Sequence, residues 1–453
     1  MAGYAPHTDA EVAAMLGTLG LADLDELFAV VPEALRLAGG LELPGGLSEP
    51  DAWARVEQLA GANRPCGPEL VCFAGGGIYD HEVPPVTRAL GSRSEFVTSY
   101  TPYQPEVAQG VLQAVFEFQT LLARLSGLPV ANASLYDGAA ALVEAVNLGV
   151  AASGRRRVLV SAGVTPAWRA VLRTFAAGTG HDVEEVPLTG GVTRFEDLGG
   201  PGAGAGGAPG VVVVSYPNYL GCLEDLGAAR ALCDRTGALL VVAFDPVCAG
   251  ILRSPGDWGA DVAVGEGQPF GMPLSFGGPL LGLFSCAMAH VRRLPGRLVG
   301  ETVDAEGRRA YVTTLRAREQ DIRREKATSN VCTNQTLMAV TAAIQLGWLG
   351  TEGLAEIALR SARGARYCRE ALLAVPGVEA LAGAPTVREF ALSLPVPAAV
   401  AVERLVEEGF LAGIPLDPDY TGGHDRGLLV AVTERRTRGE IDAFVAAVEK
   451  AVR

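Results

Sequence analysis

Apolar residues follow two different rhythms along the middle of the chain. Short strand-like runs, most of them apolar, occupy residues 158–161, 183–186, 210–217, 238–246, 261–265 and 279–285. The segments between them are typical of helices, so strands and helices are expected to alternate. Such alternation is typical of a mainly parallel sheet with helices on both faces. The pattern therefore predicts a large α/β domain over residues 65–330.

The two ends of the chain follow other patterns. Thr8-Asp-Ala-Glu11 has the sequence of a capping box, in which a hydroxyl and a carboxylate satisfy free amides at a helix start. It predicts a helical arm over residues 1–64. After residue 331 a helical pattern is followed by strand-like runs at 390–394 and 427–433, and then by a helix capped by Thr437 and Glu440. These features predict a smaller C-terminal α/β domain over residues 331–453.

Composition and charge narrow the class of protein. The chain has 453 residues, of which 49% are hydrophobic, so a large core can be buried. A formal charge of −14 opposes binding to nucleic acid, because phosphate groups attract the opposite sign. No apolar run reaches the length of a membrane span, and the first residues lack the pattern of a signal peptide. We therefore expect a cytoplasmic protein whose partners are neither nucleic acid nor membrane.

The eight cysteines indicate neither a disulfide framework nor a metal site. They are scattered along the chain without a CxxC motif or a cluster of cysteine and histidine. Several of them lie in apolar runs, where a buried free thiol is the ordinary interpretation. No metal cofactor is expected.

Lysine is nearly absent, and this limits the chemistry available to the chain. Only Lys326 and Lys450 are lysines among 37 basic residues. The apolar run 239–244 ends at Asp245, a carboxylate that could face a pyridine nitrogen, and in this the middle of the chain resembles a pyridoxal phosphate enzyme. Such a scaffold needs an amine to hold the cofactor covalently, about 25 residues further on. Residues 261–271 contain no lysine, and arginine cannot replace one, so a scaffold without its own covalent cofactor site is predicted.

One loop is expected to display aromatic and amide side chains. Pro102 and Pro105 forbid a helix there and hold the residues between them extended. Tyr100, Tyr103 and Gln104 would then be presented from a stiff loop, as recognition residues often are. The alternative is a buried polar connector whose tyrosines cover an edge of the core.

Seven sequence words resemble those of the glycine cleavage system P-protein. The resemblance is closest to subunit 1, the alpha subunit of forms that are split into two polypeptides, and it spans the chain. The words are Gly77-Ile-Tyr-Asp-His, Ser99-Tyr-Thr-Pro-Tyr-Gln-Pro-Glu, Phe116-Glu-Phe-Gln-Thr, Ala131-Asn-Ala-Ser-Leu-Tyr-Asp-Gly, Gly265-Glu-Gly-Gln, Leu274-Ser-Phe-Gly-Gly-Pro and Glu325-Lys-Ala-Thr-Ser-Asn-Val-Cys-Thr-Asn-Gln.

The resemblance implies an activity shared between two chains. It implies the fold-type I pyridoxal phosphate transferase fold and a subunit of glycine dehydrogenase, an oxidoreductase that decarboxylates glycine and passes the aminomethyl group to the lipoyl arm of H-protein. The beta subunit would carry pyridoxal phosphate on its lysine. The alpha subunit would be inactive alone and would complete the site of its partner within an α2β2 assembly.

The resemblance also suggests two groups of site residues. A shared active-site lining would include Tyr100, Tyr103, Gln104, Glu106, Lys326, Thr328, Ser329 and Asn330. A degenerate cofactor pocket would include Ser134, Asp137, Asn218, Asp245 and Gln268. Asp137 is expected to cap a helix with its own carboxylate, where an active relative would bind the cofactor phosphate.

Alternatives stay open for one segment of the chain and for the function of the chain as a whole. The arginine-rich segment 292–330 is either a solvated hairpin with paired charges, a contact surface for H-protein, or a rim of the shared site. The chain as a whole could instead be a stand-alone pyridoxal phosphate enzyme anchored at Lys326. A third possibility is a scaffold subunit without catalytic function.

Overall fold

The computed structural model describes residues 6–37, 39, 41–67, 69–196, 198, 207–316 and 320–453, and it divides the chain into two compact units. The first unit, Met1–Arg64, contains α1 (Asp9–Leu19), η1 (Asp25–Phe28), η2 (Glu33–Leu35) and α2 (Glu49–Ala60). The predicted capping box at the start of α1 is confirmed, since Thr8 and Glu11 each accept from the backbone amide of the other. The second unit is Pro65–Arg453.

A seven-stranded sheet forms the centre of the second unit. Its strand order is β2-β10-β9-β8-β7-β3-β4. The strands are β2 (Val130–Ala131), β3 (Arg157–Ser161), β4 (Asp182–Val186), β7 (Val211–Tyr216), β8 (Leu239–Phe244), β9 (Val262–Glu266) and β10 (Gly282–Cys286). Only β10 runs against its neighbours, so the sheet is mainly parallel and mixed. The fold class expected from the apolar runs is confirmed.

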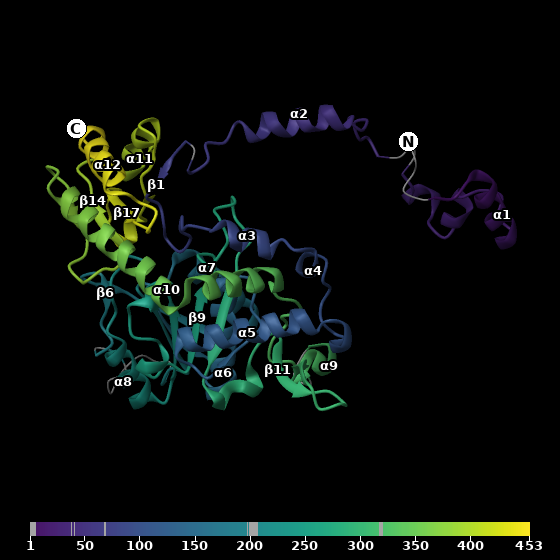
Figure 1. Cartoon of the computed structure of the whole chain (residues 1–453), viewed down its shortest axis with the longest axis horizontal. Helices are drawn as coiled ribbons and strands as arrows, with labels where there is room; N and C mark the ends of the chain where they lie inside the picture. The colour runs from purple at the N-terminus through teal and green to yellow at the C-terminus, as the bar shows by residue number, and fades with distance from the viewer. Residues whose placement is uncertain are drawn as a thin grey trace. The chain divides into compact units, whose positions relative to one another are not determined.

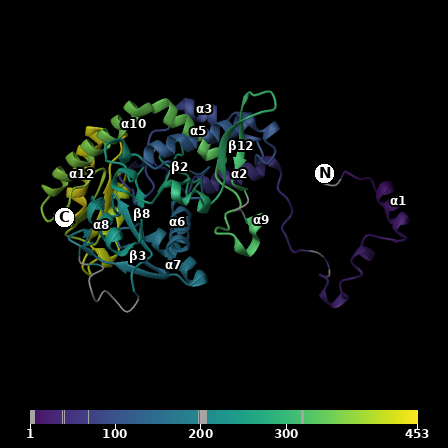
Figure 2. The same cartoon turned by 90° about the horizontal axis from the view of Figure 1, so that it is seen from below.

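Helices cover both faces of this sheet, and each strand contributes to two cores. Val212 and Val214 of β7 pack with α5 (Gln109–Ser126), α8 (Leu226–Thr236) and the start of α10 (Thr336–Leu373). Val211 and Val213 point the other way, toward α6 (Gly138–Ser153) and α7 (Pro166–Thr179). Figure 2 shows α5 and α10 on one side and α6 and α7 on the other. Burial on both faces explains why inner strands such as β7 and β8 are continuous apolar runs.

A four-stranded antiparallel sheet lies near the C-terminus. Its order is β13-β14-β17-β16, with β13 (Glu379–Ala380), β14 (Glu389–Ser393), β16 (Ile414–Pro415) and β17 (Gly427–Ala431). Helices α11 (Ala398–Glu407) and α12 (Arg438–Ala451) pack on it with the second part of α10 (Figure 1). The capping box at Thr437 and Glu440 is confirmed. Phe73 belongs to this core as well, with its ring stacked 4.0 Å from the ring of Phe444.

Shorter elements complete the unit Pro65–Arg453. They are β1 (Val71–Cys72), α3 (Pro85–Gly91), α4 (Ser94–Val97), η3 (Pro105–Val107), β5 (Leu188–Thr189), β6 (Val192–Thr193), η4 (Cys248–Gly250), η5 (Gly256–Trp258), η6 (Met288–Arg293), β11 (Leu298–Val303), β12 (Arg309–Thr314), α9 (Gln320–Arg323), η8 (Arg324–Lys326), β15 (Phe410–Leu411) and η9 (Pro418–Tyr420). Among the described residues, no helix is both long and apolar enough to cross a membrane, and no group of three or more histidine, cysteine, aspartate or glutamate side chains could hold a metal ion.

Candidate functional site

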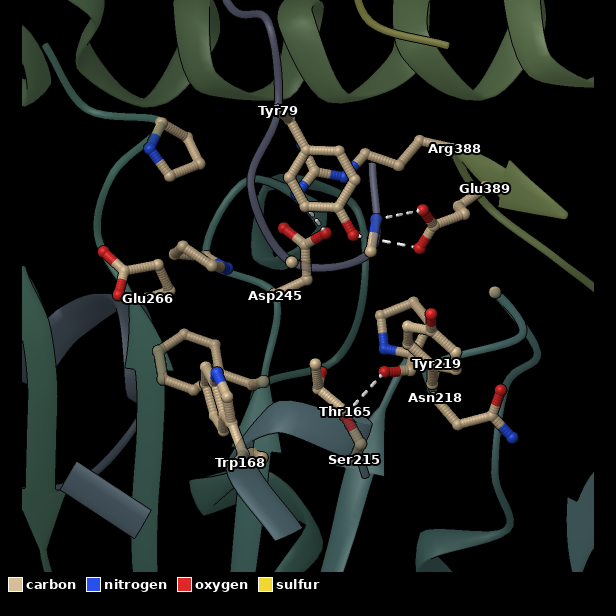
Figure 3. A pocket seen from close by; sticks show the side chains of 18 residues that line it. Tyr79, Thr165, Trp168, Ser215, Asn218, Tyr219, Asp245, Glu266, Arg388 and Glu389 are labelled. Atoms are coloured by element: carbon tan, nitrogen blue, oxygen red, sulfur yellow. Dashed lines mark hydrogen bonds and ion pairs between the residues drawn. The ribbon is translucent and has the colours of Figure 1, made fainter. Parts of the chain in front are cut away.

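The carboxyl ends of β7, β8 and β9 open into a cavity of about 60 Å³. In open parallel sheets, ligands bind outside this edge, which makes the cavity the first candidate for a functional site. Loop residues before α3, the start of α7 and the start of β14 complete its walls (Figure 3). A space of this size holds a few water molecules.

Asp245, the residue expected to face a pyridine nitrogen, is already paired with a cation. Its Oδ2 lies 2.5 Å from a guanidinium nitrogen of Arg388, a residue that is only 2% exposed. Its Oδ1 accepts from the backbone amides of Val247 and Cys248, at 2.9 and 3.1 Å. Both carboxylate oxygens therefore have partners within the chain.

The guanidinium of Arg388 is fixed from several sides. The ring of Tyr79 lies over it, with 3.6 Å between the guanidinium carbon and the ring centroid (Figure 3). Arg388 also donates to Nε2 of His81. Because this nitrogen accepts, Nδ1 of His81 carries the proton and donates to Glu434, at 2.6 Å. A stacked and hydrogen-bonded cation occupies the space beside Asp245.

Glu389 ties the loop before α3 to the C-terminal sheet. One carboxylate oxygen accepts from the amide of Gly76 at 2.6 Å, and the other accepts from the hydroxyl of Tyr79 at 3.0 Å. Burial raises the pKa of Glu389 to about 7, against the opposing effects of the Gly76 amide and Arg388. Gly221, with a φ of 80°, allows the neighbouring turn to approach, because a Cβ there would lie 1.9 Å from the carbonyl oxygen of Glu389.

E389Q is expected to change how stability depends on pH. The raised pKa means that folding favours the protonated carboxyl, so its contribution is fully present below about 4.5 and is lost as pH rises through about 7. Glutamine stays neutral and can still pair with Gly76 and Tyr79. From pH 5 to 8, E389Q should therefore gain up to about 3 kcal/mol relative to the parent chain, by urea unfolding. Tyr79, Arg388 and Asp245 also face Glu389, and all three are unchanged in the variant. If the free energies of unfolding of E389Q and the parent chain changed in parallel with pH, the raised pKa of Glu389 would be contradicted.

The start of α6 is occupied by two carboxylates. Asp137 caps the helix as expected, with its Oδ1 accepting from the amide of Ala140 at 2.7 Å. Glu266 accepts from the amide of Gly138 at 2.9 Å, and burial raises the pKa of Glu266 to about 7. Trp168 packs over the same turn, since a Cβ at Gly138 would lie 2.1 Å from its ring. A helix start is the usual place for a bound phosphate, and here side chains of the protein take that place.

Gln268 and Asn218 hold backbone segments around the cavity. The side chain of Gln268 accepts from the amide of Tyr79 at 3.1 Å and donates to the carbonyls of Tyr79 and Met272. Asn218 shapes the turn after β7 and donates to Glu224 at 2.8 Å. Of the five residues expected in a degenerate pocket, Asn218 and Asp245 line the cavity. Gln268 hydrogen-bonds Tyr79, which lines it. Asp137 precedes Gly138, whose amide donates to the lining residue Glu266.

Ser134 does not line the cavity. It is buried, and its hydroxyl accepts from the amide of Gln335 at 3.1 Å and from the side chain of Asn334 at 3.0 Å. It anchors the chain before α10 against the chain before α6.

The loop with Tyr100 and Tyr103 lies outside the cavity, along a separate groove of about 600 Å³. Tyr100 is 83% exposed and Tyr103 is 47% exposed, so the alternative of tyrosines that cover a core edge is wrong. The guanidinium groups of Arg297 and Arg316 lie 5.5 and 5.4 Å from the ring centroid of Tyr103. Gln104 precedes the short helix η3, and Glu106 within it is exposed.

The predicted lining residues at the end of η8 and after it do not line the cavity either. Lys326, Thr328 and Asn330 are exposed, and the half-buried Ser329 hydrogen-bonds Glu144 of α6. Lys450 lies in α12, paired with Glu408. Neither lysine is among the residues that line the cavity.

Sequence reasoning missed four residues that define the cavity, namely Tyr79, Glu266, Arg388 and Glu389. Tyr79 and Glu266 stood within sequence words used for the resemblance, without an assigned role. Arg388 and Glu389 precede the apolar run 390–394. A charged pair at the start of a buried strand was the available signal.

The model of the glycine cleavage system P-protein family matches residues 2–448. The chain belongs to this family. It is 47% identical to the probable glycine dehydrogenase (decarboxylating) subunit 1 of Moorella thermoacetica, over 98% of both chains. A crystal structure of glycine decarboxylase (P-protein) of the glycine cleavage system, in inhibitor-bound form, is 46% identical and has a TM-score of 0.90, covering 99% of this chain and 100% of that one.

The fold is shared more widely than the family. A sphingosine-1-phosphate lyase of Burkholderia pseudomallei is 17% identical and superposes with a TM-score of 0.65, over 93% of this P-protein family member and 94% of the lyase. The expected fold-type I fold of pyridoxal phosphate enzymes is confirmed, as is the resemblance to the P-protein family and its enzyme subunits.

Proposed function

We propose that the chain is subunit 1, the alpha subunit, of glycine dehydrogenase (decarboxylating), working in the cytoplasm with a second subunit in an α2β2 assembly. The full-length match to chains named subunit 1 supports this, since such a name implies a second polypeptide. Glycine would lose carbon dioxide, and its aminomethyl group would pass to the lipoyl arm of H-protein. Pyridoxal phosphate supplies the electron sink for such a decarboxylation when bound.

The cofactor would be held by the second subunit and not by this chain. The observation that carries this division is the buried ion pair of Asp245 and Arg388 in a cavity of about 60 Å³. The chain offers no amine there, because Gln268 follows β9 where the scaffold would need a lysine. Glu266 and Asp137 occupy the amides at the start of α6. These residues do not fit pyridoxal phosphate, so no reaction step is assigned to this cavity.

The contribution of the chain would be to complete the site of its partner. Most of the residues in the proposed lining are exposed and available for that role, and Ser329 is half-buried. The proposed lining is Tyr100, Tyr103, Gln104, Glu106, Lys326, Thr328, Ser329 and Asn330. Part of the arginine-rich segment is satisfied within the chain, since Arg308 pairs with Asp304 and Glu306. Arg316, which follows β12, lies beside Tyr103. The proposed surface for H-protein would therefore be centred on the side of the β11–β12 hairpin where Arg316 meets Tyr103.

The test is reconstitution of this chain with the second subunit, lipoylated H-protein and pyridoxal phosphate. After borohydride reduction and digestion, the cofactor should be attached to a peptide of the second subunit and to none of this chain. Omitting this chain should lower glycine-dependent release of carbon dioxide at least about a hundredfold, because the partner site would be incomplete. K450A, which removes the lysine on α12, is the control and should keep full activity.

Two outcomes would favour the other functions. Cofactor fixed on Lys326 of the isolated chain, with turnover of an amino acid, would make it a stand-alone enzyme. Full activity of the second subunit without this chain would leave it a scaffold.

A further inference from the structure

A groove of about 410 Å³ on the second part of α10 is lined by three arginines. Arg363, Arg366 and Arg369 follow one another at intervals of three residues, a spacing that makes side chains neighbours on a helix surface. Glu370 and Thr386 line the same groove. The groove therefore holds three guanidinium groups and one carboxylate, which is a local surplus of positive charge in a chain whose formal charge is −14.

Arg363 and Arg369 lack a carboxylate partner in the part of the chain that the structure describes. Arg366 pairs with Glu370 at 2.8 Å, but no acidic residue stands one helical turn from either of the other two arginines. Their side chains take part in no hydrogen bond or ion pair with the described residues. Arg369 is half-buried, which makes an unpaired charge more costly. Like charges at this helical spacing also repel, so an anion in the groove would relieve both costs.

We propose that this groove binds a small molecule that carries a phosphate group. Guanidinium groups present paired N–H donors that match the oxygens of a phosphate. A phosphate monoester carries a charge of about −1.5 to −2 near pH 7, which balances the surplus of two positive charges in the groove. The hydroxyl of Thr386 can add a donor. The volume of the groove is also within the range of small-molecule sites, which is about 300–1,000 Å³.

One wall of the groove leads along the chain to the cavity at the edge of the central sheet. Thr386 forms an isolated β-bridge with Cys222, which follows Gly221 in the turn that lines the cavity. Arg388 and Glu389, which also line the cavity, come two and three residues after Thr386. A ligand held between α10 and Thr386 would therefore restrain the segment that supplies the cavity with its cation.

The experiment is a titration of the full-length chain with inorganic phosphate, followed by calorimetry near pH 7.5 at low ionic strength. Saturable binding of one phosphate per chain is expected. Added sodium chloride should weaken it, because the groove is open to solvent and its charges are screened by salt. Binding at this groove does not depend on the proposed activity in glycine cleavage, and the measurement needs no turnover.

A double variant and a control matched in charge locate the site. R363A/R369A removes the two arginines that lack carboxylate partners, and it should weaken phosphate binding at least about tenfold. R308A/R453A makes the same change in net charge at two exposed arginines that are paired and do not line the groove, so it should bind phosphate as the parent chain does. Equal binding by R363A/R369A and the parent chain would overturn the proposal, as would equal losses in the two double variants.

A change in the opposite direction is expected when the carboxylate of the groove is removed. E370Q should bind phosphate about two- to fivefold more tightly, because a negative charge close to the anion is lost. E356Q makes the same change at a carboxylate that pairs with Arg360 outside the groove, and its affinity should stay near that of the parent chain. Absence of phosphate binding to both the parent chain and E370Q would overturn the proposal. Binding of an acidic peptide in place of phosphate would do the same and would assign the groove to a protein partner.

Discussion

Replacing Arg388 by methionine is expected to lower the free energy of unfolding by about 3–5 kcal/mol. The side chain is 2% exposed, and it pairs with Asp245, donates to His81 and lies under Tyr79. Methionine would fill much of the volume but would leave the Asp245 carboxylate without its cation in a site that excludes most water. The penalty for such an uncompensated charge is larger than the net contribution of the pair itself. Urea unfolding of the full-length chain measures the change.

The double variant D245N/R388M tests this reason. Asparagine keeps an oxygen that can accept from the amides of Val247 and Cys248, while the charge is removed. It should regain more than half of the stability that R388M loses, which gives a large coupling energy between the two sites. R366A removes an exposed arginine paired with Glu370 and should leave the urea midpoint nearly unchanged. If R388M lost no more stability than R366A, the ion pair of Asp245 and Arg388 would not be the stabilising contact in this cavity.

The central sheet was largely predictable because its signal is local. The inner strands are buried on both faces and β4 lies at the edge, and the runs 158–161, 183–186, 210–217, 238–246, 261–265 and 279–285 fall on β3, β4, β7, β8, β9 and β10. Strand β2 was not predicted, because two residues are too short to give a periodicity. It is held by pairing with β10, more than 140 positions later, which no local pattern encodes.

The cavity was predictable only where a single residue and its neighbours decide the contact. Asp137 caps α6 because the acceptor and the helix start are adjacent in sequence. The partner of Asp245 could not be deduced in this way, since Arg388 comes from the start of β14 and meets Asp245 only after the two sheets have packed. The same holds for Glu266, whose contact with Gly138 joins β9 to α6. The absence of lysine indicated that the pocket has no amine for a covalent cofactor. Only the tertiary contacts show that Arg388 and Glu266 fill it.

The exposed tyrosines lead to the second large expected effect. Replacing Tyr100 and Tyr103 together by alanine should lower glycine decarboxylation by the reconstituted complex about 10–100-fold, equivalent to about 1.4–2.8 kcal/mol of transition-state stabilisation. The chain itself gains little from these rings, because Tyr100 is 83% exposed and Tyr103 contacts mainly the arginines at its face. The variant should therefore keep the urea midpoint of the parent chain. Loss of activity without loss of stability would place the loop at the partner site.

The conservative variant and a matched control show which property of the tyrosines matters. Y100F/Y103F keeps both rings, so activity near the parent level would assign the effect to ring packing, and a loss close to that of the alanine variant would assign it to the hydroxyls. Y367F removes a hydroxyl that donates to Asp442, away from the loop, and should leave activity unchanged. Unchanged activity in Y100A/Y103A, with the assembly intact, would remove this loop from the shared site. The proposed lining would then rest on the segment from Lys326 to Asn330, whose variants are the next to measure.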